Sequence, residues 1–363
     1  MRRTAALIAG GGPAGSAAAI RLTQGGARPL LIERSRETGD ALCGGFLSWR
    51  TLQSLERLGI APEALGGHPV ARVRILTPGG QAEAPLPAGA IGVSRHRLDG
   101  VMLAAAAAAG AAVERGVSVR QARIGGVMLG DGAAIGCDAL FLATGKTDCR
   151  GLPRPRPATD DPALGLRLRL PPAPALMRLI GDAIELHLFR GGYAGLVLQE
   201  DGSANLCLAV RKSRLAESGG DPRALLAALG AESPALVERL GFADGAAVDA
   251  IGAVPYGWRA TAGEAGLFRL GDQAAVIPSL AGEGMGIAIA SGISAAEAWQ
   301  AQGPAGGAAF QTALARRTRA PVWIASRLRD GAETRWTRAL APGLMRLAPG
   351  LARWIAAATR IAP

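Results

Sequence analysis

Three glycines near the N-terminus have the type and spacing that can hold a dinucleotide. Gly10, Gly12 and Gly15 follow the pattern G-x-G-x-x-G, between a short apolar run and an alanine-rich helical segment. In a βαβ unit the first glycine allows a tight turn, the second lets backbone approach a pyrophosphate, and the third lets helix and strand pack closely. The next apolar run ends at Glu33, where an acid that binds a ribose hydroxyl is expected. These residues predict a dinucleotide site, and a glycine-rich turn without a ligand is the alternative.

A second stretch late in the chain has the same strand–loop–helix order. Residues 267–272 are an apolar run that ends in Gly-Asp, and a loop with Pro278, Gly282 and Gly284 leads into a helical pattern over 285–299. A loop of this kind places backbone groups at a helix N-terminus, where an anionic group is favoured. We therefore expect the chain to return to the nucleotide site here.

The elements that must position these motifs fall into two groups. Residues 139–145 read as a fully buried strand that ends in Ala-Thr-Gly, as in a parallel sheet next to a ligand. Prolines are dense over 152–175 and predict a crossover linker. From 164 to 254 the pattern is mainly β, with one helical insert at 223–229. The alternating residues 70–92 around Pro-Gly-Gly predict a hairpin.

The predicted fold class is α/β. A Rossmann-like nucleotide-binding domain carries an inserted, mainly antiparallel β-sheet substrate domain, and a helical C-terminal segment follows. The nucleotide-binding domain is expected to be discontinuous, over residues 1–70, 92–150 and 262–300. The sheet domain is expected over 151–261, together with the hairpin 71–91.

Composition excludes several other classes of protein. No apolar stretch reaches the roughly 20 residues that span a bilayer, and the first strand begins too close to Met1 for a signal peptide. We therefore expect a cytoplasmic protein. The cysteines have no C-x-x-C spacing and there are only 3 histidines, so neither a metal site nor a disulfide framework is predicted.

The positive charge is concentrated at the C-terminal end. The net charge is +11, and residues 301–363 hold ten arginines against Asp330 and Glu333, with three of the six tryptophans. Arginines interleaved with Trp and Leu suit peripheral contact with an anionic membrane. The favoured interpretation is short terminal helices packed on the body with solvated arginines, because Pro342 and Pro349 divide the segment. No nucleic-acid-binding module is recognised, so nucleic acid is not an expected partner.

These motifs in this order resemble the FAD-dependent oxidoreductases of the p-hydroxybenzoate hydroxylase fold. The resemblance rests on GGGPAG with its acid, on the Ala-Thr-Gly strand end, and on Gly-Asp followed by P-x-x-x-G-x-G. It covers roughly residues 1–300. The sequence Cys43-Gly44-Gly45, the Arg95-x-x-Leu-Asp99 segment and the Gly-Gly-Tyr and Pro-Tyr-Gly-Trp turns look most like the geranylgeranyl reductase branch.

The resemblance implies FAD as cofactor and assigns a role to each matching residue. The glycine loop would hold the pyrophosphate, Glu33 the adenosine ribose, and Asp272 the ribityl chain. A helix N-terminus at the pyrimidine edge of the flavin would stabilise the charge that collects there on reduction. The expected FAD-binding residues are Gly10, Gly12, Ala14, Gly15, Glu33, Gly44, Gly45, Arg95, Val119, Asp272, Gly284 and Met285.

The resemblance also implies a substrate pocket roofed by the sheet domain, with a hydrophobic small molecule as substrate. Pocket residues are expected at Phe189, Tyr193, Tyr256 and Trp258, and the candidate proton donors are the two tyrosines and Cys43. A packed pocket wall is the alternative role for each. Thr144-Gly145 stands where the hydroxylases usually carry Asp-Gly, which puts the usual handling of a nicotinamide donor in doubt.

Three functions are compatible with these residues. The first is a reductase that transfers hydride from reduced flavin to a C=C bond of an isoprenoid or polyketide-like substrate, with NADPH or another reductant as electron donor. The second is a monooxygenase that hydroxylates an aromatic or lipid-tailed substrate. The third is a flavin electron-transfer subunit that docks through residues 301–363. Fold alone does not choose between them.

Overall fold

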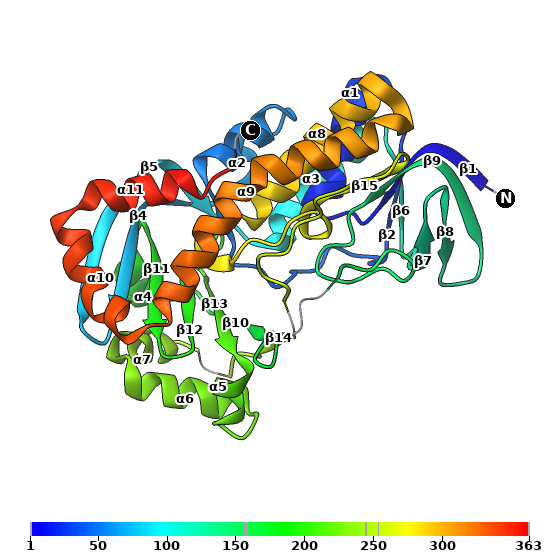
Figure 1. The fold of residues 1–363 in the computed structure, drawn as a ribbon. Helices are drawn as coiled ribbons and strands as arrows, with labels where there is room; N and C mark the ends of the chain where they lie inside the picture. The colour runs from blue at the N-terminus through cyan, green and yellow to red at the C-terminus, as the bar shows by residue number, and fades with distance from the viewer. Residues whose placement is uncertain (1, 156–158, 244, 253, 362–363) are drawn as a thin grey trace.

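The computed structural model describes residues 2–155, 159–243, 245–252 and 254–361. Two β-sheets lie side by side, and one long helix spans both (Figure 1). The first sheet has the order β6-β2-β1-β9-β8-β7, with β15 paired to β9. Its strands are β1 (Arg2–Ala9), β2 (Leu30–Glu33), β6 (Ala112–Arg115), β7 (Val119–Arg123), β8 (Gly126–Leu129), β9 (Ala134–Leu142) and β15 (Leu267–Arg269).

The centre of the first sheet is parallel because helices connect its strands. β1 pairs in parallel with β2 and β9, and β9 pairs in parallel with β15. Their central residues are apolar and fully buried, as expected for strands covered on both faces. One face packs against α1 (Pro13–Gln24), α3 (Arg95–Ala108) and α8 (Gly284–Gln302). The carboxyl ends of β1, β9 and β15 therefore meet at one edge, which carries all three predicted motifs.

The second sheet is mainly antiparallel and has the order β14-β10-β13-β12-β11-β4-β5-β3. The predicted hairpin is the β4–β5 pair, and it joins the sheet through a parallel pairing of β4 with β11. The strands are β3 (Phe46–Leu47), β4 (His68–Thr77), β5 (Gly80–Gly92), β10 (Ala163–Leu170), β11 (Ala183–Phe189), β12 (Gly192–Leu198), β13 (Ala204–Arg211) and β14 (Asp249–Ile251).

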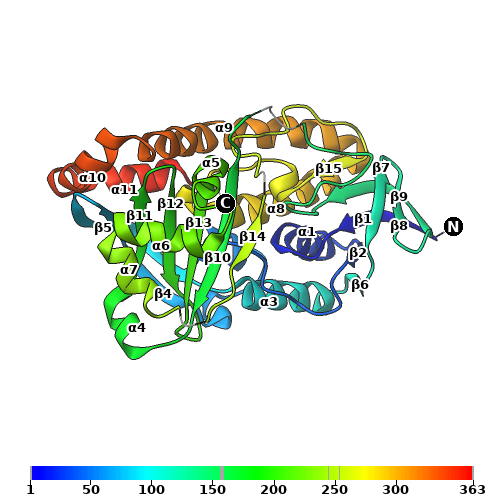
Figure 2. The same cartoon turned by 90° about the horizontal axis from the view of Figure 1, so that it is seen from below.

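Helices cover the outer face of the second sheet, as Figure 2 shows. The sequence analysis predicted one helical insert there, but the region contains α4 (Pro174–Ile180), α5 (Lys212–Ala216), α6 (Pro222–Glu232) and α7 (Pro234–Leu240). The single-helix prediction was wrong because three of these four helices have seven residues or fewer, too short for a clear 3.6-residue period. Part of the predicted proline linker, residues 156–158, lies outside the described residues.

The C-terminal segment forms three helices rather than fragments cut at each proline. They are α9 (Gly306–Ala332), which contains Pro321, α10 (Arg335–Leu347), which contains Pro342, and α11 (Pro349–Ala358). Pro342 does not end its helix because it is buried, and this packing offsets the roughly 3 kcal/mol that an interior proline costs. Pro349 begins α11, where its missing N–H costs nothing.

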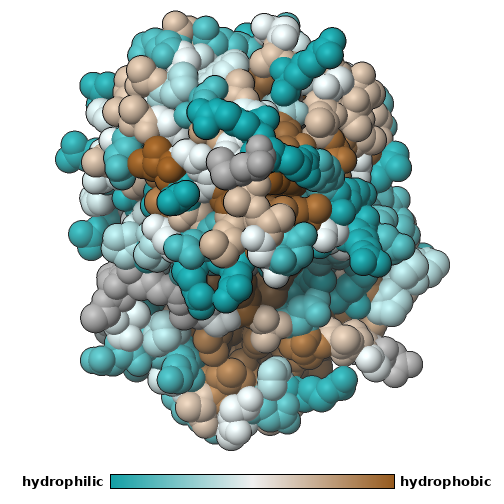
Figure 3. All heavy atoms as spheres, turned by 90° about the vertical axis from the view of Figure 1, so that its right-hand side faces the viewer, coloured by the Kyte–Doolittle hydropathy of each residue, from teal (hydrophilic) through white to brown (hydrophobic). Residues whose placement is uncertain are grey.

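The predicted α/β class with two sheet regions and a helical C-terminal segment is confirmed. Short α2 (Trp49–Glu56) completes the first helical layer. On the face of the molecule that carries β7 and β8, hydrophobic atoms lie mainly in recesses between hydrophilic side chains (Figure 3). None of the helices in the described part of the chain is both long enough and apolar enough to cross a membrane.

Candidate functional site

One cavity of about 1060 Å³ connects the predicted nucleotide site to the inner face of the second sheet. Its lining begins at the glycine loop after β1 and passes the loop before α8. It then continues between the second sheet and the C-terminal helices. The three motifs of the sequence analysis therefore share one cavity.

The glycine loop has the geometry that only glycine permits. Gly10 has a φ of +113°, and a Cβ there would lie 2.4 Å from the carbonyl oxygen of Ala143. A Cβ on Gly15 would lie 1.9 Å from the carbonyl oxygen of Gly10. The first glycine therefore lets β1 turn beside β9, and the third lets α1 begin against that turn. Ala14 and Gly12 line the cavity.

Three further predicted residues surround this loop. Glu33 accepts the backbone N–H of Gly11 at 2.7 Å, which holds its carboxylate beside the loop at the end of β2. Arg95 is mostly buried and pairs with Asp99 at 2.7 Å. A Cβ on Gly12 would lie 3.3 Å from the Arg95 guanidinium, so this cation faces the phosphate loop. Val119 lines the cavity at the start of β7.

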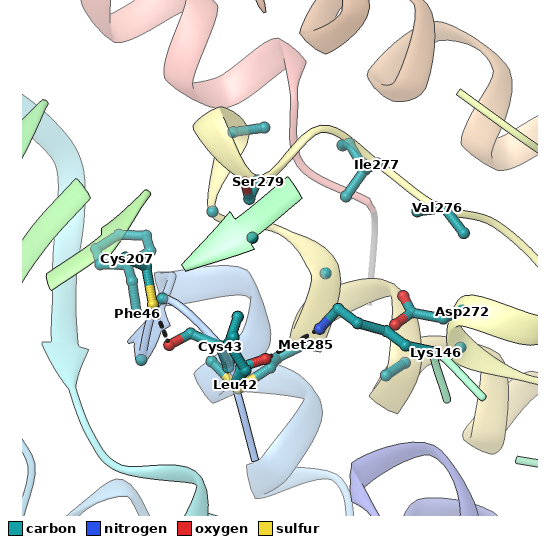
Figure 4. Close-up of a pocket in the computed structure, with 18 of the residues that line it drawn as sticks. Leu42, Cys43, Phe46, Lys146, Cys207, Asp272, Val276, Ile277, Ser279 and Met285 are labelled. Carbon is teal, nitrogen blue, oxygen red and sulfur yellow. Dashed lines mark hydrogen bonds between the residues drawn. The ribbon is translucent and has the colours of Figure 1, made fainter. Parts of the chain in front are cut away.

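The second motif lines the cavity next to the glycine loop. Asp272 follows β15 and lines the cavity, and its position beside Lys146 is visible in Figure 4. Gly284 is the first residue of α8, and nothing lies within 4 Å of a Cβ built on it. Met285 also lines the cavity. The helix N-terminus therefore points its free backbone N–H groups into open cavity space.

Sequence reasoning missed two residues that fasten the loop after β9 to the loop after β15. Arg154 is buried and donates to the backbone oxygens of Lys146 (2.6 Å) and Asp272 (2.8 Å). The Gln273 side-chain amide donates to the carbonyl oxygens of Gly145 and Thr147. These bonds fix the Ala-Thr-Gly strand end against the Gly-Asp strand end. Neither Arg154 nor Gln273 is part of a recognised motif, so no pattern in the sequence could identify them.

Lys146 is a cavity residue that the sequence analysis did not select. Its Nζ donates to the carbonyl oxygen of Leu42 at 3.0 Å and reaches across the space between Asp272 and the Cys43 loop (Figure 4). It directly follows the Ala-Thr-Gly motif and is one of only two lysines in the chain. That combination was the available signal. Its charge stands where an anionic cofactor would be held.

Two predicted tyrosines meet at one serine beside the α8 loop. The hydroxyl of Tyr193 lies 2.6 Å from Ser279 Oγ and accepts the backbone N–H of Leu280 at 2.7 Å. The hydroxyl of Tyr256 lies 3.0 Å from the same Ser279 Oγ. Burial raises the pKa of both tyrosines. Both phenols therefore keep their protons at neutral pH, and the three hydroxyls form a continuous hydrogen-bonded chain.

The Cys43 loop forms a further part of the cavity lining. The carbonyl oxygen of Cys43 accepts hydrogen bonds from Asn205 Nδ2 (2.9 Å) and from the Cys207 thiol (3.0 Å), the latter shown in Figure 4. Burial raises the pKa of Cys207 to about 12, so it acts as a neutral thiol donor. Gly44 has no neighbour within 4 Å of a Cβ, whereas Gly45 has a φ of +72°. The loop therefore offers bare backbone to the cavity.

Two predicted pocket residues lie elsewhere. Phe189 is buried in the core on the outer face of the second sheet. Side chains alternate along a strand, so Leu186 and Leu188 of β11 face the cavity and Phe189 faces away. Trp258 has its ring 6.0 Å from the Arg154 guanidinium and is absent from the described cavity lining. The resemblance of these two turns to those of the reductases therefore did not place either side chain in the cavity.

The distal part of the cavity is apolar and involves the C-terminal helices. Leu186 and Ile75 are register partners on β11 and β4, and Leu86 lies on β5. From Tyr193 on β12 to Leu86 on β5 there are three strand spacings, roughly 14 Å. Opposite them lie apolar side chains of α9–α11, namely Leu328, Ala332, Trp336, Leu340, Leu344, Met345, Leu351, Ala352 and Ile355. The sequence analysis did not assign these helices to the pocket.

These observations test whether the residues fit FAD. A dinucleotide needs a glycine loop, an acid at the end of β2, and open backbone at a second helix N-terminus, and all three line one cavity. The cations Arg95 and Lys146 line it as well, which suits a pyrophosphate. The residues therefore fit FAD along the wall from Glu33 to Met285.

Comparison with known proteins agrees with this reading. Residues 3–126 match the family described as FAD binding domain. A curated relative, "Menaquinone reductase" of Mycolicibacterium smegmatis, is 30% identical over 163 residues, which are 41% of this chain and 39% of that protein. An uncharacterised Methanosarcina barkeri protein is 35% identical over 114 residues, which are 29% of this chain and 61% of that protein. The chain thus spans less than two thirds of the length of either relative.

Solved structures share the fold along nearly the whole chain. A flavoprotein/dehydrogenase from Cytophaga hutchinsonii has a TM-score of 0.81 at 16% identity, covering 99% of this chain and 92% of that one. A geranylgeranyl bacteriochlorophyll reductase-like protein from Thermoplasma acidophilum has a TM-score of 0.69 at 18% identity, covering 97% and 100%. PqsL, a probable FAD-dependent monooxygenase from Pseudomonas aeruginosa, has a TM-score of 0.70 at 19% identity, covering 94% and 100%.

The comparisons establish the fold and one domain. The chain has the p-hydroxybenzoate hydroxylase fold, and its residues 3–126 match an FAD binding domain. This fold occurs in both reductase-like and monooxygenase neighbours, so the reaction has to be argued from the cavity.

Proposed function

We propose that this chain reduces a C=C bond of a hydrophobic, isoprenoid or polyketide-like substrate by hydride transfer from reduced FAD. The observation that carries the proposal is that one cavity contains both the predicted flavin-binding residues and the distal apolar part over β11, β4 and β5. We call this apolar part the tunnel. The chain of three hydroxyls lies where the two parts meet. A flat polar substrate would leave the tunnel unfilled, whereas a substrate with an apolar chain would occupy it.

The protein's part in the hydride step is placement of the cofactor. FAD, when bound and reduced, supplies the hydride. Gly44 and the backbone at Gly284 leave room for a flat ring between the Cys43 loop and α8. The α8 N-terminus would stabilise negative charge at the ring edge, because its N–H groups are oriented before the reaction begins. Arg154 holds the backbone at Asp272 and the backbone at Lys146 together through its two hydrogen bonds.

The protein's part in the second step is supply of a proton. Reduction of a C=C bond forms one C–H bond with the hydride and another with a proton, while the flavin loses two electrons. Tyr256 lines the cavity and keeps its proton because burial raises its pKa. Ser279 and Tyr193 can replace that proton through hydrogen bonds of 3.0 and 2.6 Å. We assign Tyr256 as the proton donor and Tyr193 as its relay partner.

The electron donor is part of the proposal. Thr144-Gly145 followed by Lys146 replaces the Asp-Gly of the hydroxylases, and Lys146 places a cation in the cavity. NADPH is the first donor to test, with dithionite as a reductant that needs no binding site. Menaquinone is the first substrate to test, because it is the compound named for the relative in Mycolicibacterium smegmatis.

The test is an anaerobic single turnover of the purified FAD-loaded protein. Reduced protein mixed with menaquinone should reoxidise, and the product should gain two hydrogens in its side chain by mass spectrometry. Tyr256→Phe should slow this step about 100-fold, the lower range for loss of a general acid. It should leave FAD content unchanged.

Other outcomes would contradict the proposal. An oxygen atom in the product, with a transient absorbance intermediate when oxygen is admitted, would identify a monooxygenase. Reoxidation only by a partner protein would identify an electron-transfer subunit. Equal rates for Tyr256→Phe and the wild type would show that Tyr256 is not the proton donor.

A further inference from the structure

An exposed apolar surface surrounds the outer end of the cavity. Helices α10 and α11 carry six exposed large apolar side chains, from 41% exposed at Leu351 to 88% exposed at Leu347. We name this set the apolar rim: Trp336, Leu340, Leu344, Leu347, Leu351 and Trp354. The first four recur at helical spacing, so they form one stripe along α10. Several large apolar side chains exposed side by side are typical of an interaction site.

The opposite face of the same helices is already used. Pro342 and Met345 of α10 are buried, and Met345 packs against Ala82 and Ala84 of β5. The helices lie at the end of the molecule next to β4 and β5 (Figure 1). The apolar rim lies outside this packed face, and packing within the described chain leaves its side chains exposed.

The apolar rim is continuous with the cavity. Trp336, Leu340, Leu344 and Leu351 are exposed to solvent and also line the cavity. The apolar part of the cavity over β11, β4 and β5 is therefore continuous with the exposed surface at these residues. A molecule that leaves the tunnel thus meets an apolar surface rather than water.

The arginines around the apolar rim indicate which kind of partner it would bind. The chain from 334 to 363 contains five arginines and no acid. Arg335 and Arg353 are exposed and form no ion pair within the described residues, and Arg346 reaches back to the carbonyl oxygen of Gln81. Interleaved arginines and apolar side chains on short helices complement anionic headgroups above an acyl layer. Two exposed tryptophans, Trp336 and Trp354, suit the boundary between those layers.

We propose that the α10–α11 face lies on an anionic lipid bilayer and that the substrate enters the cavity directly from the lipid. Leu347 and Trp354 would insert into the acyl boundary, while Arg335 and Arg353 would contact lipid phosphates. The cavity mouth would then open into the layer in which a hydrophobic substrate dissolves. The entry route rests on the proposed function, but the membrane contact does not.

The test measures binding of the FAD-loaded protein to vesicles without turnover. Wild-type protein should float with vesicles of 70% phosphatidylcholine and 30% phosphatidylglycerol and should float poorly with phosphatidylcholine alone. Leu347→Glu should weaken binding at least tenfold. Leu347 is the variant of choice because it is the most exposed rim residue and does not line the cavity. Val237→Glu, at a 49% exposed position on α7, is the matched control and should bind like the wild type.

The charge contribution has its own prediction. Each of Arg335→Gln and Arg353→Gln should weaken binding to anionic vesicles about fivefold, since one basic residue near such a surface contributes about 1 kcal/mol. The two effects should shrink in 0.5 M salt. Equal flotation of Leu347→Glu and the wild type, or no flotation of either, would overturn the membrane proposal.

A second copy of the chain is the competing occupant of the rim. Sedimentation of a dimer that Leu347→Glu dissociates, together with absent vesicle binding, would assign the rim to that interface. Vesicle binding with no menaquinone turnover would contradict the proposed function and would still support the membrane contact.

Discussion

At the residue scale, the glycines of the site are of two kinds. Some are required by the backbone packing, and others leave space for a ligand. Gly15 cannot accept a side chain, because its Cβ would meet the Gly10 carbonyl oxygen at 1.9 Å. At Gly284 a Cβ would meet nothing within 4 Å. Space rather than backbone strain therefore accounts for glycine at 284. That space is where the ring edge of FAD is predicted to lie.

We predict that Gly284→Val leaves the fold intact and impairs cofactor binding. The side chain would project into the cavity, so FAD affinity should fall at least tenfold, or about 1.4 kcal/mol. The unfolding temperature of the cofactor-free protein should stay within 2–3 °C of the wild type, since roughly 0.5 kcal/mol is at stake. FAD titration by fluorescence and thermal unfolding measure the two effects.

The control for this prediction is Gly100→Ala in α3, another glycine with open space around a Cβ but outside the cavity. Its FAD affinity should be unchanged. Unchanged FAD affinity in Gly284→Val would show that the flavin ring does not lie against the start of α8.

At the element scale, the end of the chain is fastened to the start of α8. Glu283 precedes α8, is fully buried, and pairs with Arg360 at 2.7 Å. It also accepts the Ile361 backbone N–H and the Ser48 hydroxyl. Arg360 lies over Phe46 and Trp49 as well. Burial raises the pKa of Glu283 and outweighs the opposing effect of Arg360, so loss of the guanidinium would leave a costly buried carboxyl.

We predict that Arg360→Met destabilises the protein by about 3 kcal/mol, the lower range for breaking a buried ion pair. Glu283→Gln combined with Arg360→Met should recover more than half of the loss, because no charge is then left unpaired. Urea unfolding measures both variants. Arg353→Met, on the exposed surface of α11, should cost little. Additive losses in the double variant would show that the pair is not coupled.

At the scale of the whole molecule, a buried charge cluster ties the second sheet to its outer helices. Glu185 of β11 contacts Arg74 of β4 (2.5 Å) and Arg239 of α7 (2.8 Å), and His187 lies 3.1 Å away. Burial would raise the pKa of Glu185, but hydrogen bonds and charges from His187 and Arg239 lower it to about 2. Its ordinary pKa of 4.5 applies once the chain unfolds.

This shift predicts how acid affects stability. The lowered pKa contributes stability above pH 4.5, and this stability disappears as the pH falls from 4.5 to 2. It is on the order of 3 kcal/mol in this linkage. Glu185→Gln should therefore be less stable than the wild type at pH 7, and the difference should shrink through that window.

Urea unfolding at pH 7, 4.5 and 2.5 measures the difference. Glu56→Gln, at an exposed position just inside the end of α2, serves as control and should show no such trend. A difference between Glu185→Gln and the wild type that is constant with pH would show that the carboxylate is not stabilised by its neighbours.

The sequence by itself determined the features that are local in the chain. The G-x-G-x-x-G loop, Glu33 and the late Gly-Asp segment predicted their turns and helix starts, because glycine geometry and helix N-termini depend on neighbouring residues. The same patterns predicted two sheet regions and the hairpin that joins the second one. They could not show that all motifs share one cavity.

Only the tertiary structure decided contacts between distant segments. Arg154, Gln273 and the Glu283–Arg360 pair carry no motif and acquire their roles from strand ends and helices that meet in space. Phe189 was misplaced because a one-residue shift along a strand changes its face. The C-terminal helices form a cavity wall because β4 and β5 leave an apolar face for them to cover. That need arises from burial of apolar surface across the whole molecule, and no short stretch of sequence records it.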